Sequence, residues 1–198
     1  MRITAIKQQV KDQNRYSIFI DDEFSFGMSE LSLIESGITK GQELTDVELA
    51  KYKDTAELDL AYNKALGLIS RRLRSEWEIK EYLHRKKYAP EQIDAIVARL
   101  YKRSWLNDEA FARMWVENRR LLKSASARRI TQELKAKRVS EDTIRSALEN
   151  DSNTDSAILK ELIISKRKQS RYQDDQKLLA YLMRQGYNYA DVKQHMEI

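Results

Sequence analysis

Three stretches in the last two-thirds of the chain repeat one order of apolar positions, with successive apolar residues 4, 5, 5 and 4 positions apart. The second copy starts 51 residues after the first, and the third starts 48 residues after the second. The shared positions are Ile79, Leu83, Tyr88, Ile93 and Val97; Ile130, Leu134, Val139, Ile144 and Leu148; and Leu178, Leu182, Tyr187, Val192 and Met196. Repeats of this period are typical of stacked helical arrays. The pattern predicts one helical unit used three times, whose extended surface suits a long partner better than a closed catalytic cleft.

Capping signals divide each copy into two short helices around a tight turn. Ser75 and Glu78 form a potential capping box at the start of the first pair. Pro90 is tolerated in the first turn of the next helix, and the position before it holds the good N-cap residues Ser140 and Asn188 in the other copies. A longer helix is expected before each pair, over residues of about 55–73, 109–122 and 155–168.

The first part of the chain has a different periodicity. Short runs of β-branched and aromatic residues lie at 2–6, 16–20 and 23–26. Turn-forming residues separate these runs, so they predict a three-stranded meander. A short helix from about Ser29 to Ser36, ended by Gly37, is expected next. The helical pattern resumes at Thr45, which forms a second potential capping box with Glu48.

These patterns predict a mainly α-helical fold, with three tandem three-helix repeats of helix-turn-helix type and a small N-terminal β-meander. The expected domains are an N-terminal element at 1–54 and helical repeats at 55–108, 109–150 and 151–198. The chain has five Gly and one Pro among 198 residues, which suits long helices and short turns.

Several classes of protein are disfavoured by the composition. No run approaches the 18 or so apolar residues that a membrane-spanning helix needs, and the first residues lack the pattern of a signal peptide. The absence of cysteine excludes disulfides and thiolate metal sites. We therefore expect a cytoplasmic protein that does not contact a membrane.

Charge is unevenly distributed along the chain. Residues 1–60 hold 7 Lys or Arg against 12 Asp or Glu, a net charge of −5, whereas residues 61–198 hold 29 against 19, a net charge of +10. The repeats are thus the basic part, which favours a polyanion or an acidic protein surface as their partner.

Some of the basic residues recur at one place in the repeat. They precede Ser75 in the first copy and flank the corresponding place in the second, which makes a continuous basic stripe plausible, although solvated helix faces remain the alternative. The candidate binding residues are Arg71, Arg72, Arg74, Arg119, Arg120, Arg128, Arg129, Lys135, Lys137 and Arg138.

Little in the sequence points to catalysis or to a cofactor. The two histidines, His84 and His195, have no second His or Cys at the spacing of metal ligands. Paired acids such as Asp174 and Asp175 could bind a cation, but at helix starts such residues more often act as caps. The five glycines form no phosphate-binding or dinucleotide-binding pattern. We expect no catalytic residue, no metal and no cofactor.

Two short helices around a turn also describe a helix-turn-helix, which can present its second helix to a DNA groove. A sequence-independent DNA-binding protein is therefore one alternative, and a helical scaffold with no salt-sensitive partner is another. Trp77, Trp105 and Trp115 could stack on bases, whereas Tyr88 and Tyr187 occupy an apolar position of the repeat and are expected in the core.

Four segments of the chain resemble the signatures of the RecX family of regulatory proteins. They are SRRLRSEWEI at 70–79, WLNDEAFA at 105–112, RITQEL at 129–134 and YLMRQGY at 181–187. The resemblance covers about residues 56–198. It implies tandem three-helix repeats that bind the RecA recombinase, lie in the groove of the RecA–DNA filament and inhibit its recombination, ATPase and coprotease activities. The implied protein is a monomer that binds single- or double-stranded DNA only weakly by itself.

The chain departs from the family pattern at two turns. The third copy has Gly186 where a helix ends in the left-handed conformation, but the first copy has Lys87 and the second has Arg138. We expect each of these two residues to strain its turn or to shift its geometry slightly.

Overall fold

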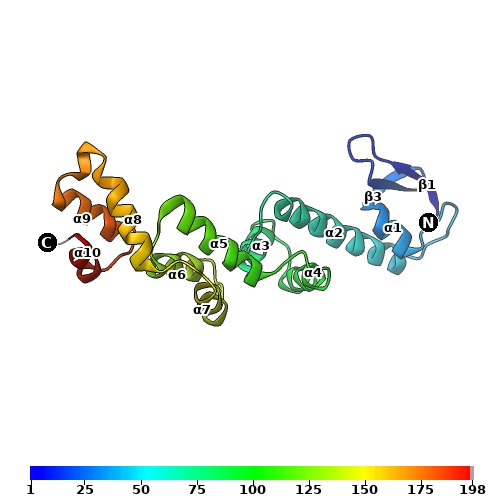
Figure 1. Ribbon diagram of the computed structural model, residues 1–198. Coiled ribbons are helices and arrows are strands. Elements are labelled where there is room, and N and C mark those ends of the chain that lie inside the picture. Colours follow the sequence, from blue (N-terminus) through cyan, green and yellow to red (C-terminus); the bar gives the residue numbers. More distant parts are fainter. Residues whose placement is uncertain (197–198) are drawn as a thin grey trace. The chain divides into compact units, whose positions relative to one another are not determined.

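The computed structural model describes residues 1–196, which form a small sheet followed by α-helices (Figure 1). The fold is mainly helical with an N-terminal meander, as the sequence predicts. The strands are β1 (Ile3–Gln8), β2 (Arg15–Ile20) and β3 (Glu23–Ser29). The helices are α1 (Glu30–Ser36), α2 (Asp46–Ile69), α3 (Glu76–Arg85), α4 (Pro90–Lys102), α5 (Asp108–Lys123), α6 (Ala127–Ala136), α7 (Glu141–Glu149), α8 (Asp155–Arg167), α9 (Asp175–Arg184) and α10 (Tyr189–Met196), and a 3-10 turn lies at Ser170–Tyr172.

The chain divides into two compact units, and the boundary passes through α3. Unit 1 comprises residues 1–72 and 82–105, and unit 2 comprises residues 73–81 with the described residues from 106 onward. The four-part division expected from the sequence stays a prediction, and its last two residues lie outside the described part of the chain.

In unit 1 an antiparallel sheet of order β1-β2-β3 packs against helices α1 and α2. Its core is formed by one face of the sheet, where Ile3, Ile18 and Met28 are fully buried. Ser29 is the N-cap of α1, and Gly37 ends this helix with φ 66°. The meander and the short helix are therefore confirmed.

A buried carboxylate joins the meander to α2. Asp59 accepts hydrogen bonds from the Ser29 backbone N–H (2.7 Å), the Ser29 hydroxyl (2.6 Å) and the Ser32 hydroxyl (2.7 Å), and it pairs with Arg15 at 3.3 Å. Burial alone would raise the pKa of Asp59, but these hydrogen bonds and the Arg15 charge lower it below its ordinary value.

Helix α2 begins directly after the predicted capping box of Thr45 and Glu48, but it ends at Ile69 rather than near Leu73. The early end has a packing reason. Leu73 lies in unit 2, where it packs against the core around Phe111 and Leu134, so the chain leaves the helix before this residue.

In unit 2 the apolar positions of the second and third copies form two cores. Helices α5, α6 and α7 enclose Ile130, Leu134, Val139 and Ile144, and helices α8, α9 and α10 enclose Leu178, Leu182, Tyr187, Val192 and Met196. Of the fifteen positions in the repeat pattern, all are buried except Tyr88 and Leu148, which are half-buried. The register of the repeat is therefore confirmed.

Candidate binding surface

The start of a short helix is closed twice in unit 2 by the turn of the following repeat. Ser75 precedes α3, and its hydroxyl donates to the carbonyl oxygen of Lys137, in the α6–α7 turn, at 3.3 Å. Ser126 is the N-cap of α6, and its backbone N–H donates to the carbonyl oxygen of Gln185, in the α9–α10 turn, at 3.1 Å. Ser75 and Ser126 are 0% and 1% exposed. We call this recurring contact the cap-turn joint.

An aspartate of the next long helix completes each joint. The Asp108 carboxylate, at the start of α5, accepts from the Glu76 backbone N–H at 2.8 Å. The Asp155 carboxylate, at the start of α8, accepts from the Ala127 backbone N–H at 3.0 Å. Because helix starts leave backbone N–H groups without helical partners, each joint satisfies donors that would otherwise be buried and unpaired.

The three turns share a left-handed residue. Lys87, Arg138 and Gly186 have φ values of 64°, 57° and 95°. The two basic residues therefore adopt the conformation that glycine adopts in the third turn.

Six of the candidate basic residues lie on or near α6, and they fall into two groups. The side chains of Arg128, Lys135 and Arg138 are exposed. Lys135 pairs with Glu141 at 2.6 Å, whereas Arg128 and Arg138 form no ion pair with the residues that the structure describes. Arg119, Arg129 and Lys137 are half-buried and hold the repeats together.

The half-buried group is organised by Glu133 and Glu78. Glu133 accepts from Arg119 Nε at 2.5 Å, Arg129 Nε at 3.3 Å and Trp115 Nε1 at 2.9 Å. Partial burial would raise the pKa of Glu133, but the bonds from Arg119 and Trp115 lower it. Lys137 Nζ lies 3.1 Å from a Glu78 oxygen and 4.6 Å from the centre of the Trp115 ring.

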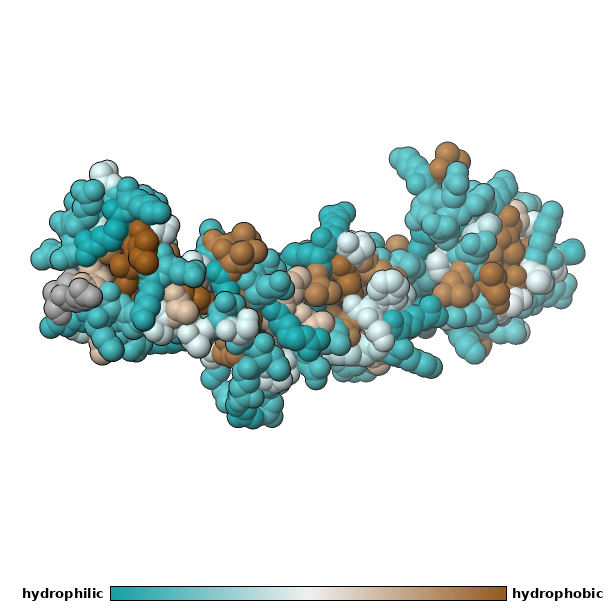
Figure 2. Space-filling view, viewed as in Figure 1, coloured by the Kyte–Doolittle hydropathy of each residue, from teal (hydrophilic) through white to brown (hydrophobic). Residues whose placement is uncertain are grey.

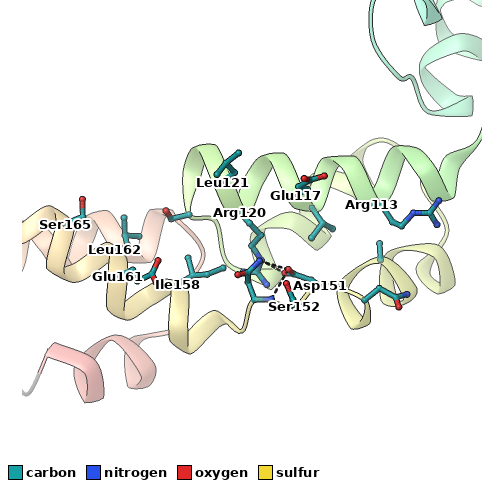
Figure 3. Close-up of a pocket in the computed structure, with 15 residues that line it drawn as sticks. Arg113, Glu117, Arg120, Leu121, Asp151, Ser152, Ile158, Glu161, Leu162 and Ser165 are labelled. Atoms are coloured by element: carbon teal, nitrogen blue, oxygen red, sulfur yellow. Dashed lines mark hydrogen bonds and ion pairs between the residues drawn. The ribbon is translucent and has the colours of Figure 1, made fainter.

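Arg120 lies inside unit 2 and not on its surface, so it leaves the candidate binding set. Its guanidinium pairs with Asp151 at 2.7 Å and with Asp155 at 2.5 Å, and it also donates to the carbonyl oxygen of Ala125. Burial would lower the pKa of Arg120, but the two carboxylates raise it, so the guanidinium stays charged. Figure 3 shows the Arg120–Asp151 pair at the wall of a groove of about 670 Å³ between α5 and α8.

The remaining candidates precede α3 and are divided between the units. Arg71 and Arg72 are exposed and belong to unit 1. Arg74 belongs to unit 2, is half-buried, and lies 3.8 Å from Glu78.

The two short helices of the second repeat carry opposite charge. Helix α6 contains Arg128, Arg129 and Lys135 with the single acid Glu133. Helix α7 contains three acids and one base, and all four side chains are exposed: Glu141, Asp142, Glu149 and Arg145. A helix that enters a DNA groove lies between two phosphate backbones, so α7 is poorly suited to that role.

The three tryptophans differ in exposure and in their contacts. Trp115 is half-buried, lies 5.6 Å from Phe111 between ring centres and bonds to Glu133. Trp77 is 37% exposed and Trp105 is 53% exposed. On the face drawn in Figure 2, hydrophilic side chains predominate and apolar ones gather in separate patches.

The described residues contain no group of three or more His, Cys, Asp or Glu side chains that could hold a metal ion. Within the same part of the chain, no helix is both long and apolar enough to cross a bilayer. His195 bonds through its two ring nitrogens to the Ser156 hydroxyl and to the Asp191 carbonyl oxygen, both at 2.8 Å.

Comparisons with known proteins agree on one family. Residues 1–45 match the model of the regulatory protein RecX N-terminal domain, residues 61–100 that of the RecX first three-helix domain, and residues 107–148 that of the RecX second three-helix domain. The acidic N-terminal element therefore has a counterpart in the family.

Similar curated proteins carry the description "Regulatory protein RecX". The one from Oceanobacillus iheyensis is 37% identical over 180 residues, covering 87% of this chain and 65% of that protein. The one from Listeria innocua is 30% identical over 95% of this chain and 72% of that protein, and the one from Bacillus subtilis is 28% identical over 98% and 76%. The chain thus spans about two-thirds to three-quarters of the length of these relatives.

Two solved structures share the fold. A crystal structure of regulatory protein RecX superimposes with a TM-score of 0.75 at 24% identity and covers 100% of this chain and 99% of that one. A crystal structure of RecX from Lactobacillus salivarius gives a TM-score of 0.60 at 17% identity, covering 71% of this chain and 94% of that one.

Proposed function

Because the chain belongs to the RecX family of regulatory proteins, we propose that it binds the RecA–DNA filament and inhibits the recombination, ATPase and coprotease activities of RecA. It acts by binding rather than by catalysis, as a monomer in the cytoplasm. One observation supports the proposal above all: three exposed cations lie on and just after α6, while the neighbouring helix α7 carries three exposed acids and one exposed base.

The binding surface that we assign consists of Arg128, Lys135 and Arg138. A RecA filament on DNA presents phosphates and acidic side chains that recur along its length, and a chain of helical repeats can follow such a partner. The half-buried Arg119, Arg129 and Lys137 are held by internal acids, so their main role is to position the helices that carry this surface.

The chain inhibits by occupying the filament. A bound chain bridges neighbouring RecA subunits, blocks access of duplex DNA or of the cleavable repressor, and stops the growing end. Blocking a growing end affects many subunits at once, so inhibition is expected at fewer than one chain per RecA.

Groove reading by a helix-turn-helix receives less support. The second short helix of the second repeat carries Glu141, Asp142 and Glu149 on its exposed face, and phosphates would repel them. Weak DNA binding that is independent of sequence remains part of the proposal, through the cations of the α6 surface.

Two measurements test the proposed function. The first is the rate of RecA-dependent ATP hydrolysis on single-stranded DNA while the full chain is added from about 0.01 to 2 molecules per RecA. If the rate of ATP hydrolysis falls at well below one chain per RecA, end blocking is supported. If the rate falls only near equimolar amounts, simple competition explains the inhibition instead. The second is a pulldown of the chain with RecA, with single-stranded DNA, and with both in the presence of ATP. Capture by DNA alone, with no gain from RecA, would favour the DNA-binding alternative.

A further inference from the structure

Two turns of this protein hold a basic residue in a conformation that residues with a Cβ atom rarely adopt. Lys87, between α3 and α4, has φ 64°, and Arg138, between α6 and α7, has φ 57°. Few residues other than glycine occupy this region of the backbone map. Backbone strain of this kind occurs often at functional sites, so the side chain of such a residue is a candidate for function.

Backbone hydrogen bonding imposes the conformation at all three turns. After each left-handed residue, the next N–H returns to the carbonyl oxygen of the leucine that the three copies share: Tyr88 to Leu83 at 3.3 Å, Val139 to Leu134 at 3.2 Å and Tyr187 to Leu182 at 3.4 Å. This is the bonding of a Schellman cap, in which glycine is the usual residue. The fold therefore requires the geometry, and it does not require a basic side chain.

The interior of the protein gives no reason for the two cations. Both side chains are exposed, and neither forms an ion pair or a side-chain hydrogen bond within residues 1–196. Nearby cations differ in this respect, because Lys137 pairs with Glu78 at 3.1 Å and Lys135 pairs with Glu141 at 2.6 Å.

The residue before each strained position is also basic. The first turn reads Lys86–Lys87 and the second reads Lys137–Arg138, whereas the third reads Gln185–Gly186. Lys86 is exposed beside Lys87, whereas Lys137 is half-buried and paired with Glu78, so Arg138 is the exposed cation of the second turn. Exposed cations at a turn attract phosphates. Their presence at the same place in two successive repeats fits a partner that carries many negative charges, as a nucleic-acid backbone does.

We propose that Lys87 and Arg138 are separate phosphate contacts, one at each turn, to the DNA carried by the RecA filament. This inference rests on the proposed function and names the DNA backbone as the partner of these two residues. An acidic surface of RecA is the alternative that the experiment must exclude. The third repeat, with Gly186 at the same place, makes no such contact.

Glycine substitutions test the proposal because they have two opposite effects. Removing the backbone strain should stabilise the fold, whereas removing the charge should weaken DNA binding. Lys87→Gly, Arg138→Gly and the double variant of the full chain relieve the backbone, so each should melt at a higher temperature by roughly 2 to 4 °C per site. Each should nevertheless bind a fluorescent single-stranded oligonucleotide more weakly in anisotropy titrations from about 50 to 200 mM salt. The slope of log affinity against log salt should become shallower by about 0.7 per lost contact.

Two controls separate charge from turn geometry. Lys160→Ala removes one exposed cation from the middle of α8 and should leave the salt slope unchanged. Arg138→Lys keeps the charge and should keep the slope of the parent chain. Stabilised glycine variants with unchanged affinity and unchanged slope would overturn the proposal.

The same variants distinguish DNA contact from RecA contact and from failure of the proposed function. If the glycine variants lose affinity for RecA without DNA but keep their affinity for the oligonucleotide, the phosphate assignment is wrong. If the parent chain binds the oligonucleotide through these turns but never slows RecA, the proposed function is wrong. If the parent chain slows RecA and the double variant slows it equally with the same oligonucleotide affinity, only the present inference fails.

Discussion

Gly186 lies directly against Ser126, so a Cβ atom at position 186 would overlap the Ser126 hydroxyl. The same Cβ atom would lie 2.7 Å from Arg129 Cβ, well inside van der Waals contact. Glycine is therefore required at this turn for two reasons: the left-handed φ of 95° and the close approach of the start of α6.

Gly186→Ala should lower the stability of unit 2 by about 1 to 3 kcal/mol, because it adds both backbone strain and overpacking at the cap-turn joint. Gly67→Ala is a matched control. Gly67 lies inside α2, and a Cβ atom added there would have no neighbour within 4 Å, so alanine should stabilise by about 0.5 to 1 kcal/mol. Urea denaturation followed by circular dichroism measures the stability of both variants. Equal changes in stability for the two substitutions would contradict the close packing of Gly186 against Ser126.

Leu134→Ala should cost about 2 to 5 kcal/mol, because Leu134 is fully buried in the core of α5, α6 and α7. Loss of this core should also abolish inhibition of RecA, although no basic residue is removed. Leu121→Ala removes a leucine that is 78% exposed and should change the melting curve little. A parental melting curve for Leu134→Ala would be incompatible with the observed register.

Arg128→Ala and Arg129→Ala should behave differently, although the two residues are adjacent. Arg128 is exposed, so its loss should weaken filament binding and change the free energy of unfolding by no more than about 0.5 kcal/mol. Arg129 donates to the Arg184 carbonyl oxygen at 2.8 Å and to Gln185 Oε1 at 2.9 Å, so its loss should also destabilise the third repeat. Chemical denaturation and filament pulldown separate the two outcomes.

Arg145→Ala is the control for Arg128→Ala. It removes the same charge from the exposed face of α7, outside the proposed surface. Filament binding should therefore fall for Arg128→Ala and hold for Arg145→Ala. An equal loss for both variants would indicate a response to net charge alone.

Asp59→Asn should destabilise unit 1 by about 3 to 5 kcal/mol at neutral pH, since it leaves Arg15 and the serine donors without a buried anion. The folded pKa of Asp59 is lowered, so its contribution is present above the unfolded pKa of about 3.9 and is lost as the pH falls through the folded value. The gap between parent and variant should therefore close below about pH 4. A gap that stays constant from pH 7 to pH 3 would show that the charge of Asp59 is not the cause.

Much of the helical architecture could be predicted because the apolar register and the caps are local signals. The Ser75–Glu78 capping box, the N-cap of Ser140 and the burial of Leu134 follow from residues within a few positions of one another. The prediction of Arg120 as a surface residue is wrong because it relies on the usual exposure of basic residues. A local signal exists, since Arg120 follows Ala112 and Val116 at successive steps of four and so lies on the buried face of α5.

The contacts between elements could not be predicted in the same way. Asp151 and Asp155, which neutralise Arg120, lie 31 and 35 residues further along the chain. The serines that bind Asp59 are 27 and 30 residues away from it. Periodicity places a residue on a face of its own helix, but it does not identify which distant element covers that face.

The cap-turn joint gives unit 2 a polarity. In both joints that residues 1–196 contain, the start of a short helix is closed by the turn and the aspartate of the repeat that follows. Local unfolding should therefore spread in one direction. Melting of α8–α10 uncovers Ser126 and the start of α6. Asp174, the N-cap of α9 in the third repeat, is exposed already, so melting of the second repeat does not uncover it. Unfolding under mechanical tension would then proceed stepwise from the C-terminal repeat toward the N-terminus, because each repeat stabilises the helix start of the repeat before it.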